Sequence, residues 1–156
     1  MRNPTPNILT KYAPLSAWTV AEKQASRSPF KLFKTGAVLL DNRGNIVSRG
    51  CSHMREASVP RNSVHAEQHT LMGIGDATGL SCLIVTINKS GNWAGCSKCC
   101  SFCTHILHKA GVKQVIYAER SNDGEWTVNV ESLESLISRV NYDMINETYT
   151  KQMRVA

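Results

Sequence analysis

Apolar positions near the start of the chain recur at helical spacing and are followed by two extended runs. The helical stretch is defined by four apolar residues on one face: Leu15, Trp18, Ala21 and Ala25. Residues 33–40 (FKTGAVLL) predict a buried strand, and residues 46–48 predict a second one. Turn-forming residues at 41–45 join the two, so a β-hairpin is predicted.

The middle of the chain alternates between helical and extended patterns. A helix is predicted to open near His65, and residues 82–87 (CLIVTI) predict a strand that is covered on both faces. The next helix carries Phe102 and ends near Gly111, which suits a C-cap. Residues 112–117 predict a further strand.

The two ends of the chain are predicted to differ. The first 13 residues are expected to be loose, whereas a helical segment is predicted over about residues 129–153, with Asn129 as its N-cap. The apolar face of that helix is formed by Val130, Leu133, Leu136, Ile137 and Val140. No repeat or linker divides residues 1–156, so we expect one domain with a core at about 33–118. The alternation of helices and strands predicts a three-layer α/β/α fold around one mixed sheet.

Length and composition suit a folded domain. The chain has 156 residues, of which 42% are hydrophobic, close to the norm for globular proteins. No apolar run approaches the roughly 20 residues that a membrane span needs. The N-terminal residues lack the apolar centre of a secretory signal. A soluble, cytoplasmic protein is therefore expected.

Positive charge is concentrated in the first third of the chain. The formal net charge is +6, and residues 1–50 alone contain eight Lys or Arg residues against Glu22 and Asp41. Such asymmetry indicates an anionic partner, either a nucleotide phosphate or a nucleic-acid backbone. A solvated basic surface is the alternative, and charge alone does not decide between them.

Cysteines are clustered rather than spread. There are six, and four of them fall within residues 96–103. A small secreted domain would use such cysteines for disulfides, but this chain is long enough to bury its own core and has no export signal. The clustering favours metal binding.

Two short segments combine metal ligands with an acid. His65-Ala66-Glu67 and Cys100-Ser101-Phe102-Cys103 both open predicted helices. One imidazole and two thiolates match a catalytic zinc site, which commonly has three protein ligands and leaves a fourth position for water. Residues three apart lie on one helix face, so both thiolates can reach one ion. Glu67 is placed to move protons beside the metal.

This pairing of H-A-E with C-x-x-C resembles the signature of the zinc-dependent cytidine and deoxycytidylate deaminase superfamily, in which an H-x-E motif precedes a P-C-x-x-C motif. The resemblance extends from about Thr35 to Tyr117, and the layout is closest to the deoxycytidylate and tRNA-adenosine deaminase branch. It implies a cytidine-deaminase-like fold with one mixed five-stranded sheet, one zinc per chain, and hydrolytic release of ammonia. It also implies that His65, Cys100 and Cys103 hold the zinc, that Glu67 is catalytic, and that the protein is a homo-oligomer.

Three features depart from the family pattern. Cys99 replaces the proline before the first metal cysteine, and Gly50-Cys51-Ser52-His53 replaces an aromatic-asparagine pair whose Asn contacts ribose in relatives. The loop at residues 88–98 is longer than usual, which suggests a substrate lid. Cys96 and Cys99 form a second C-x-x-C, so a structural four-cysteine site is an alternative. We favour Cys100 and Cys103 because they directly begin the apolar-periodic helix.

Several other residues have two interpretations. Ser52, His53 and Ala66 are candidate substrate contacts. Trp93 and Phe102 either stack on a base or pack in the protein. Cys51 and Cys82 are expected to be structural, and His69 is either a residue that supports the metal ligands or an ordinary packed histidine.

The leading hypothesis is deamination of a cytosine nucleoside or nucleotide. A phosphate would be met by a local cluster such as Lys31, Lys34, Arg49 or Arg55. One alternative is a polynucleotide deaminase acting on cytosine or adenine, which the basic first third favours and the low aromatic content of 6% disfavours. Another is an inactive, zinc-stabilised binding or regulatory module, which the presence of Glu67 disfavours.

Overall fold

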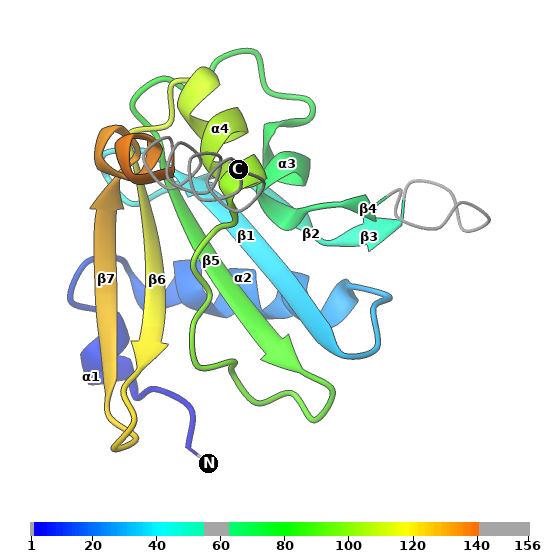
Figure 1. Ribbon diagram of the computed structural model, residues 1–156, viewed down its shortest axis with the longest axis vertical. Coiled ribbons are helices and arrows are strands. Elements are labelled where there is room, and N and C mark those ends of the chain that lie inside the picture. The colour runs from blue at the N-terminus through cyan, green and yellow to red at the C-terminus, as the bar shows by residue number, and fades with distance from the viewer. Residues whose placement is uncertain (1, 55–62, 141–156) are drawn as a thin grey trace, which may run out of the picture.

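A five-stranded mixed sheet forms the centre of the protein in the computed structural model, which describes residues 2–54 and 63–140 (Figure 1). The strand order is β2-β1-β5-β6-β7; β5 and β6 are parallel, and the other neighbours are antiparallel. The strands are β1 (Phe33–Leu40), β2 (Ile46–Cys51), β5 (Ser81–Asn88), β6 (Gln114–Arg120) and β7 (Trp126–Ser132). A smaller sheet pairs β3 (His53–Met54) with β4 (Ser63–Val64).

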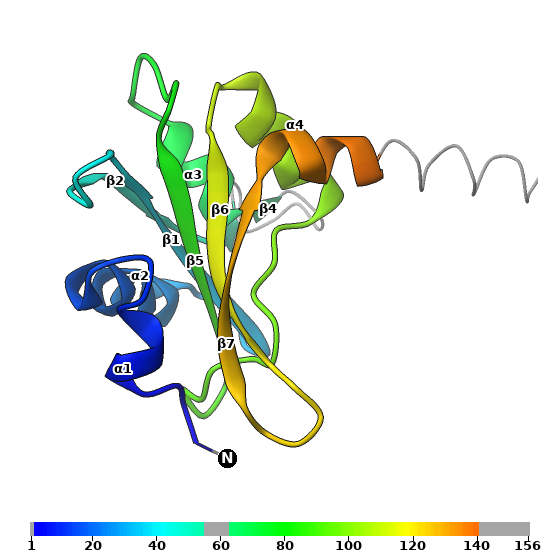
Figure 2. The same cartoon turned by 90° about the vertical axis from the view of Figure 1, so that its left-hand side faces the viewer.

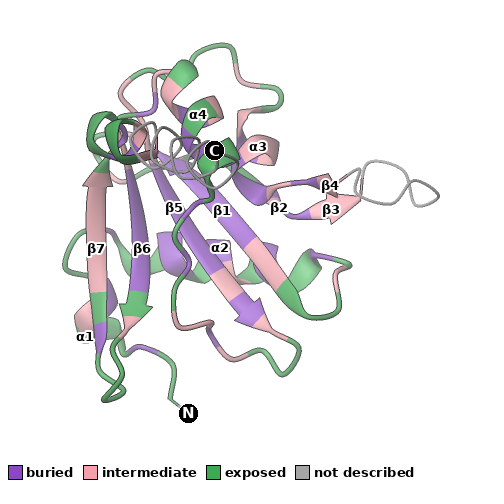
Figure 3. Ribbon diagram, in the orientation of Figure 1, coloured by how far each residue is buried: buried purple, intermediate pink, exposed green. Residues whose placement is uncertain are grey.

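Helices cover both faces of the large sheet (Figure 2). On one face lie α1 (Pro6–Leu9) and α2 (Leu15–Arg27); on the other lie α3 (Ala66–Leu71), α4 (Ser101–Lys109) and a helix that begins at residue 133. Successive residues of β1 supply the two cores, since Val38 packs on the α2 side and Leu39 on the α4 side. The central strands are consequently buried on both faces (Figure 3). The predicted three-layer α/β/α fold is confirmed.

Two glycines let helices approach the sheet closely. A Cβ at Gly36 would lie 2.0 Å from the backbone oxygen of Ala21, where α2 crosses β1. A Cβ at Gly50 would lie 2.7 Å from Cβ of His69 and 2.8 Å from the Ala66 oxygen, where α3 crosses β2. Atoms this close clash, so glycine is required at both crossings. The second crossing fixes the position of the helix that carries Glu67.

Residues 88–98 fill the gap between the parallel strands. β5 and β6 pair only over Ser81–Ile84 and Gln114–Tyr117. Beyond that point, Ala94 N–H donates to the Thr86 oxygen and Arg120 N–H to the Gly95 oxygen, each at 2.8 Å. The loop therefore continues the hydrogen bonding of the sheet, because diverging parallel strands leave backbone groups that need partners.

The C-terminal helix begins later than predicted. Residues 126–132 form strand β7, in which Asn129 pairs with Tyr117 of β6 instead of capping a helix. The cap is Ser132, whose hydroxyl accepts a hydrogen bond from Ser135 N–H at 3.1 Å. Trp126, Val128 and Val130 alternate along the strand and pack against one core. This period-two pattern indicates a strand, but the helical spacing of the apolar residues from Val130 onward led to the prediction of a helix. Residues 141–153 of the predicted segment lie outside the described residues.

The N-terminal residues, expected to be loose, are held against the body of the protein. Trp18 Nε1 donates to the Leu9 oxygen at 2.8 Å, and Trp126 Nε1 donates to the Arg2 oxygen at 2.9 Å. Leu9 is buried. Two indole N–H groups that would otherwise lack partners thus explain the ordering of this segment. Within the described ranges, no helix has the length and apolarity to cross a membrane.

Candidate metal and active site

Three candidate zinc ligands meet at the ends of two helices. His65 Nδ1 lies 3.3 Å from Cys103 Sγ and 3.6 Å from Cys100 Sγ. Zinc–sulfur and zinc–nitrogen bonds of about 2.3 and 2.0 Å place two tetrahedral ligands about 3.6 Å apart. The donor atoms are therefore spaced to bind one zinc ion, and Cys100 is exposed while Cys103 is buried.

Helix starts place all three donors, as predicted. His65 is the N-cap of α3, and Cys100 is the N-cap of α4 with Cys103 in the first turn. The Cys103 thiol donates to Cys100 Sγ and lowers the pKa of Cys100 to about 5, and the N–H of Cys103 and the His65 ring act in the same direction. A thiolate is thus available at neutral pH, which is the form that binds zinc.

The other two cysteines of the run point elsewhere. Cys99 is 8% exposed, and its Sγ lies 3.3 Å from Thr104 Oγ1 in the core beneath α4. Burial raises the pKa of Cys99 to about 11. Cys96 is exposed and forms a strand-like bridge with Glu119. The structure therefore brings His65 together with Cys100 and Cys103, not with Cys96 and Cys99.

Glu67 lies in the first turn of α3, beside the ligands. Its side chain is almost completely buried, at 4% exposed, and it lines the same cavity as His65 and Cys100. Burial raises the pKa of the Glu67 carboxyl. A carboxyl whose pKa is shifted towards neutrality is suited both to take and to give a proton.

A cavity of about 260 Å³ opens over these residues. Ser52 and Ala66, two of the three candidate substrate contacts, line it, whereas His53 is not among the described lining residues. Ser52 Oγ is 2.8 Å from Ser28 Oγ and accepts from Thr35 N–H at 3.1 Å. Ser52 is thus held in place by the protein, and it does not present the free amide of the family's asparagine.

The loop at residues 88–98 is not a lid. Trp93 is buried, stacks near Trp18 and Trp126, and donates from Nε1 to Glu22 at 2.6 Å. The predicted closure over a ligand is therefore wrong, because the loop is fixed between strands. Of the two interpretations of Trp93, the structure shows packing within the protein. Only its last residues, Ser97 and Lys98, reach the cavity.

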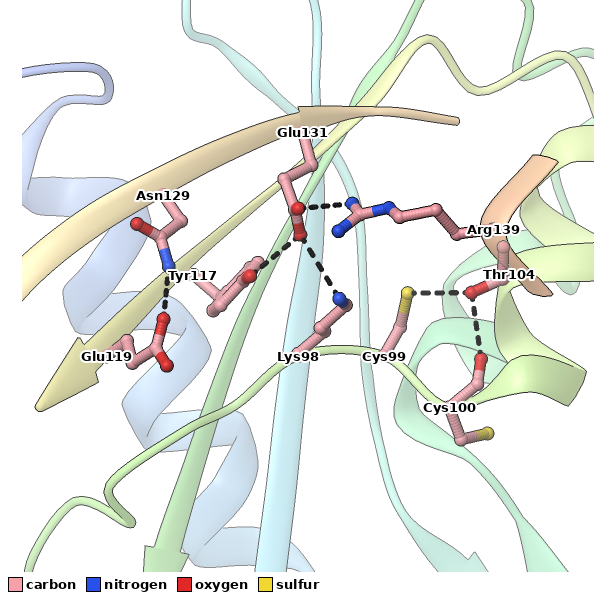
Figure 4. Close-up of polar contacts among 9 residues, drawn as sticks. All are labelled: Lys98, Cys99, Cys100, Thr104, Tyr117, Glu119, Asn129, Glu131 and Arg139. Atoms are coloured by element: carbon pink, nitrogen blue, oxygen red, sulfur yellow. Dashed lines mark hydrogen bonds and ion pairs between the residues drawn. The ribbon is translucent and has the colours of Figure 1, made fainter. Parts of the chain in front are cut away.

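Lys98, which lines the cavity, also belongs to a polar network around Glu131 (Figure 4). Its ammonium lies 3.7 Å from the Glu131 carboxylate, and it is partly exposed. Glu131 also accepts from Tyr117 OH at 2.7 Å and pairs with Arg139. Glu131 therefore has two partners besides Lys98.

Some wall residues carried no signal in the sequence. Thr35 and Thr86 face each other across β1 and β5, with hydroxyl oxygens 3.0 Å apart. Phe30 and Phe33 stand at the cavity as well, and Phe33 is largely exposed. The pairing of β1 with β5 brings the two threonines together. Phe102 is exposed and meets the His65 ring edge-on, and Cys82 is buried in the core as expected.

Comparisons with known proteins agree with this geometry. A family model described as the cytidine and deoxycytidylate deaminase zinc-binding region matches residues 13–119. Among solved structures, a cytidine deaminase from Burkholderia pseudomallei has a TM-score of 0.56 at 21% identity, covering 78% of this chain and 94% of that chain. Cytidine deaminases from Mycobacterium tuberculosis and Mycobacterium leprae each give a TM-score of 0.50 at 18% identity over 78% of this chain, covering 91% and 94% of their own chains. These structural similarities show a shared fold, and no curated protein sequence matches.

The donor set found in the structure suits the metal that the family uses. One imidazole nitrogen and two cysteine sulfur atoms at tetrahedral spacing fit zinc and leave room for a fourth ligand in the cavity. The family model spans well over half of the 156 residues. The chain therefore belongs to the cytidine and deoxycytidylate deaminase family and is a zinc-dependent deaminase.

Proposed function

We propose that the protein deaminates cytosine in a free nucleoside or nucleotide, with His65, Cys100 and Cys103 as zinc ligands and Glu67 as the catalytic acid and base. The reaction consumes one water and converts the cytosine ring to uracil with release of ammonia. The observation that carries this proposal is the buried carboxyl of Glu67 beside three zinc donors, all on one small cavity.

The zinc ion, when bound, acidifies a water molecule for attack on the ring. Glu67 would take one proton from that water and deliver it to the ring nitrogen next to the reacting carbon. It would then take the second proton from the hydroxyl formed on that carbon and deliver it to the departing amine, so that ammonia leaves and the carbonyl of uracil forms. Burial keeps its pKa raised, which favours this exchange of roles. Ala66, at the first position of α3, offers a backbone N–H that has no partner within the helix and suits a carbonyl oxygen of the base.

The size and charge of the cavity favour a small substrate. At about 260 Å³ it lies just below the range of small-molecule sites, which run from about 300 to 1,000 Å³. Among the described lining residues, Lys98 is the one Lys or Arg. Lys31, Lys34 and Arg49 do not line it, and Arg55 lies outside the described residues. A single cation suits one phosphate better than a polynucleotide backbone, which needs several.

Kinetics on three substrates test the proposal. We expect turnover of deoxycytidine or its monophosphate with weak dependence on salt. A polynucleotide enzyme would act efficiently only on a cytosine-containing oligonucleotide, and its affinity would fall steeply with salt because counterions are released on binding. That second pattern would overturn the proposal. Ammonia release from none of the three would also overturn it.

Lys98→Gln separates nucleotide from nucleoside. Loss of the ammonium should raise KM for the monophosphate and leave deoxycytidine almost unchanged. Lys113→Gln is the matched control, because Lys113 is exposed and does not line the cavity. An equal effect of Lys98→Gln on both substrates would mean that Lys98 does not contact the phosphate.

We also propose a homo-oligomer in the cytoplasm. Leu32 and Phe33 are 73% and 62% exposed beside the cavity, and a second copy of the chain would cover them. None of the six cysteines forms a disulfide, which suits a reducing compartment. The mass in solution, measured by light scattering, tests the oligomer; a monomer at micromolar concentration would contradict it.

A further inference from the structure

A second group of metal-binding side chains lies outside the active-site cavity. Cys51 ends β2, His53 begins β3, and His69 lies on α3, and one donor atom from each falls within 4.8 Å of the others. All three side chains are partly exposed. None of them lines the cavity described above. Figure 1 shows the junction of β2 and β3 beside α3.

The backbone of Cys51 orients both rings. His53 Nδ1 lies 2.8 Å from the Cys51 carbonyl oxygen, so this nitrogen donates and the lone pair of the neutral ring is on Nε2. Histidines that bind metals commonly donate their other ring N–H to a carbonyl in this way. The ring of His53 is therefore in the tautomer that a metal ion needs.

His69 is oriented by the opposite group of the same residue. Its Nδ1 accepts from Cys51 N–H at 3.0 Å, so its lone pair faces Cys51. The two rings meet edge to face with centroids 4.6 Å apart. An ion at the Cys51 side chain would use this lone pair in place of a single backbone hydrogen bond.

We propose that Cys51, His53 and His69 form a second zinc site. One thiolate and two imidazoles are good zinc ligands, and the partial exposure of all three leaves a route for the ion and a position for a fourth ligand. The family resemblance alone implies one zinc per chain, so the two hypotheses predict different metal contents.

The second site would connect the two walls of the active site. Cys51 and His53 flank Ser52, which lines the cavity, and His69 follows Glu67 by two residues on α3. The close crossing of α3 over β2 at Gly50 already brings these elements together. An ion at this point would hold the substrate wall and the catalytic helix at a constant separation, which is a structural role.

Zinc counting on the full-length protein tests the proposal. After dialysis against excess zinc and gel filtration, we expect two equivalents per chain by elemental analysis. His53→Asn keeps a donor for the Cys51 carbonyl, and His69→Asn keeps an acceptor for the Cys51 N–H, but neither retains the ring nitrogen that binds the metal. Each of these variants, and Cys51→Ser, should hold one equivalent.

Controls distinguish loss of this site from misfolding. Cys100→Ser should also hold one equivalent, and the Cys51→Ser, Cys100→Ser double variant should hold none. His105→Asn, a change at an exposed histidine of α4, should keep two. One equivalent in the unaltered protein, or two in Cys51→Ser, would overturn the second site. Because the readout is metal content, this result is independent of which substrate the enzyme uses.

Discussion

Cys99 and Cys100 are adjacent in the chain but lie in opposite environments. Cys100 is exposed at the start of α4, and its pKa is lowered to about 5 by the thiol of Cys103, the N–H of Cys103 and His65. Cys99 is buried beside Thr104, and burial raises its pKa to about 11. Each belongs to a C-x-x-C with the same spacing. The start of the helix, not the spacing, decides which pair faces His65.

The partners of these two cysteines differ for the same reason. Cys103 lies on the first turn of α4 with Cys100, so the two sulfur atoms share one side of the helix. Cys96 lies in an extended segment paired with β6, where a spacing of three residues does not bring side chains together. The two C-x-x-C pairs therefore differ because one lies on a helix and the other on extended backbone.

Removal of Cys100 should have the largest effect. Cys100→Ser replaces a thiolate with a hydroxyl that stays protonated, so the site at His65 should lose its zinc and deaminase activity should fall below detection. Elemental analysis and an ammonia assay measure both. Cys96→Ser is the matched control and should keep zinc and activity. Loss of zinc from Cys96→Ser, with full zinc in Cys100→Ser, would show that Cys96 and Cys99 bind the metal.

Glu67→Gln should separate metal binding from chemistry. The amide has the size of the carboxyl but cannot accept a proton, so turnover should fall by about 10²–10⁴-fold. Zinc content should be unchanged, because Glu67 is not one of the three donors. Unchanged turnover at full zinc occupancy would remove Glu67 from the mechanism.

Trp93→Ala tests whether the packing of the 88–98 loop holds Cys96 and Cys99 away from the metal site. Loss of this buried ring should lower the free energy of unfolding by about 3–5 kcal/mol, as measured by denaturant titration. The folded variant should keep its zinc, since the ligands lie on helix starts and not in the loop. An unchanged free energy of unfolding together with a changed KM would instead indicate that the loop acts as a lid over the substrate.

Cys99→Ala should have the smallest effect. The change removes one buried sulfur and should cost about 1 kcal/mol of folding stability. Thr104 keeps a partner, because its hydroxyl also donates to the Cys100 oxygen at 2.9 Å. Zinc content and turnover should stay normal. Loss of zinc would show that Cys99 is also a ligand of the metal.

Local sequence determined the parts of this protein that depend on neighbouring residues. Apolar spacing predicted α2, β1, β5 and α4, because side-chain periodicity follows directly from backbone geometry. The motifs at His65 and Cys100 predicted two helix starts that present metal ligands, since capping is a property of a few consecutive residues. These features required no knowledge of the sheet.

Tertiary structure decided whatever depends on pairing between distant segments. The order of the strands turned residues 126–132 into an edge strand, fixed the loop at 88–98 between β5 and β6, and set Thr35 opposite Thr86. It also brought His69 to Cys51 and His53, which are 16 or more positions away along the chain. Hydrogen bonds between strands and helix crossings set these distances, and no local pattern encodes them.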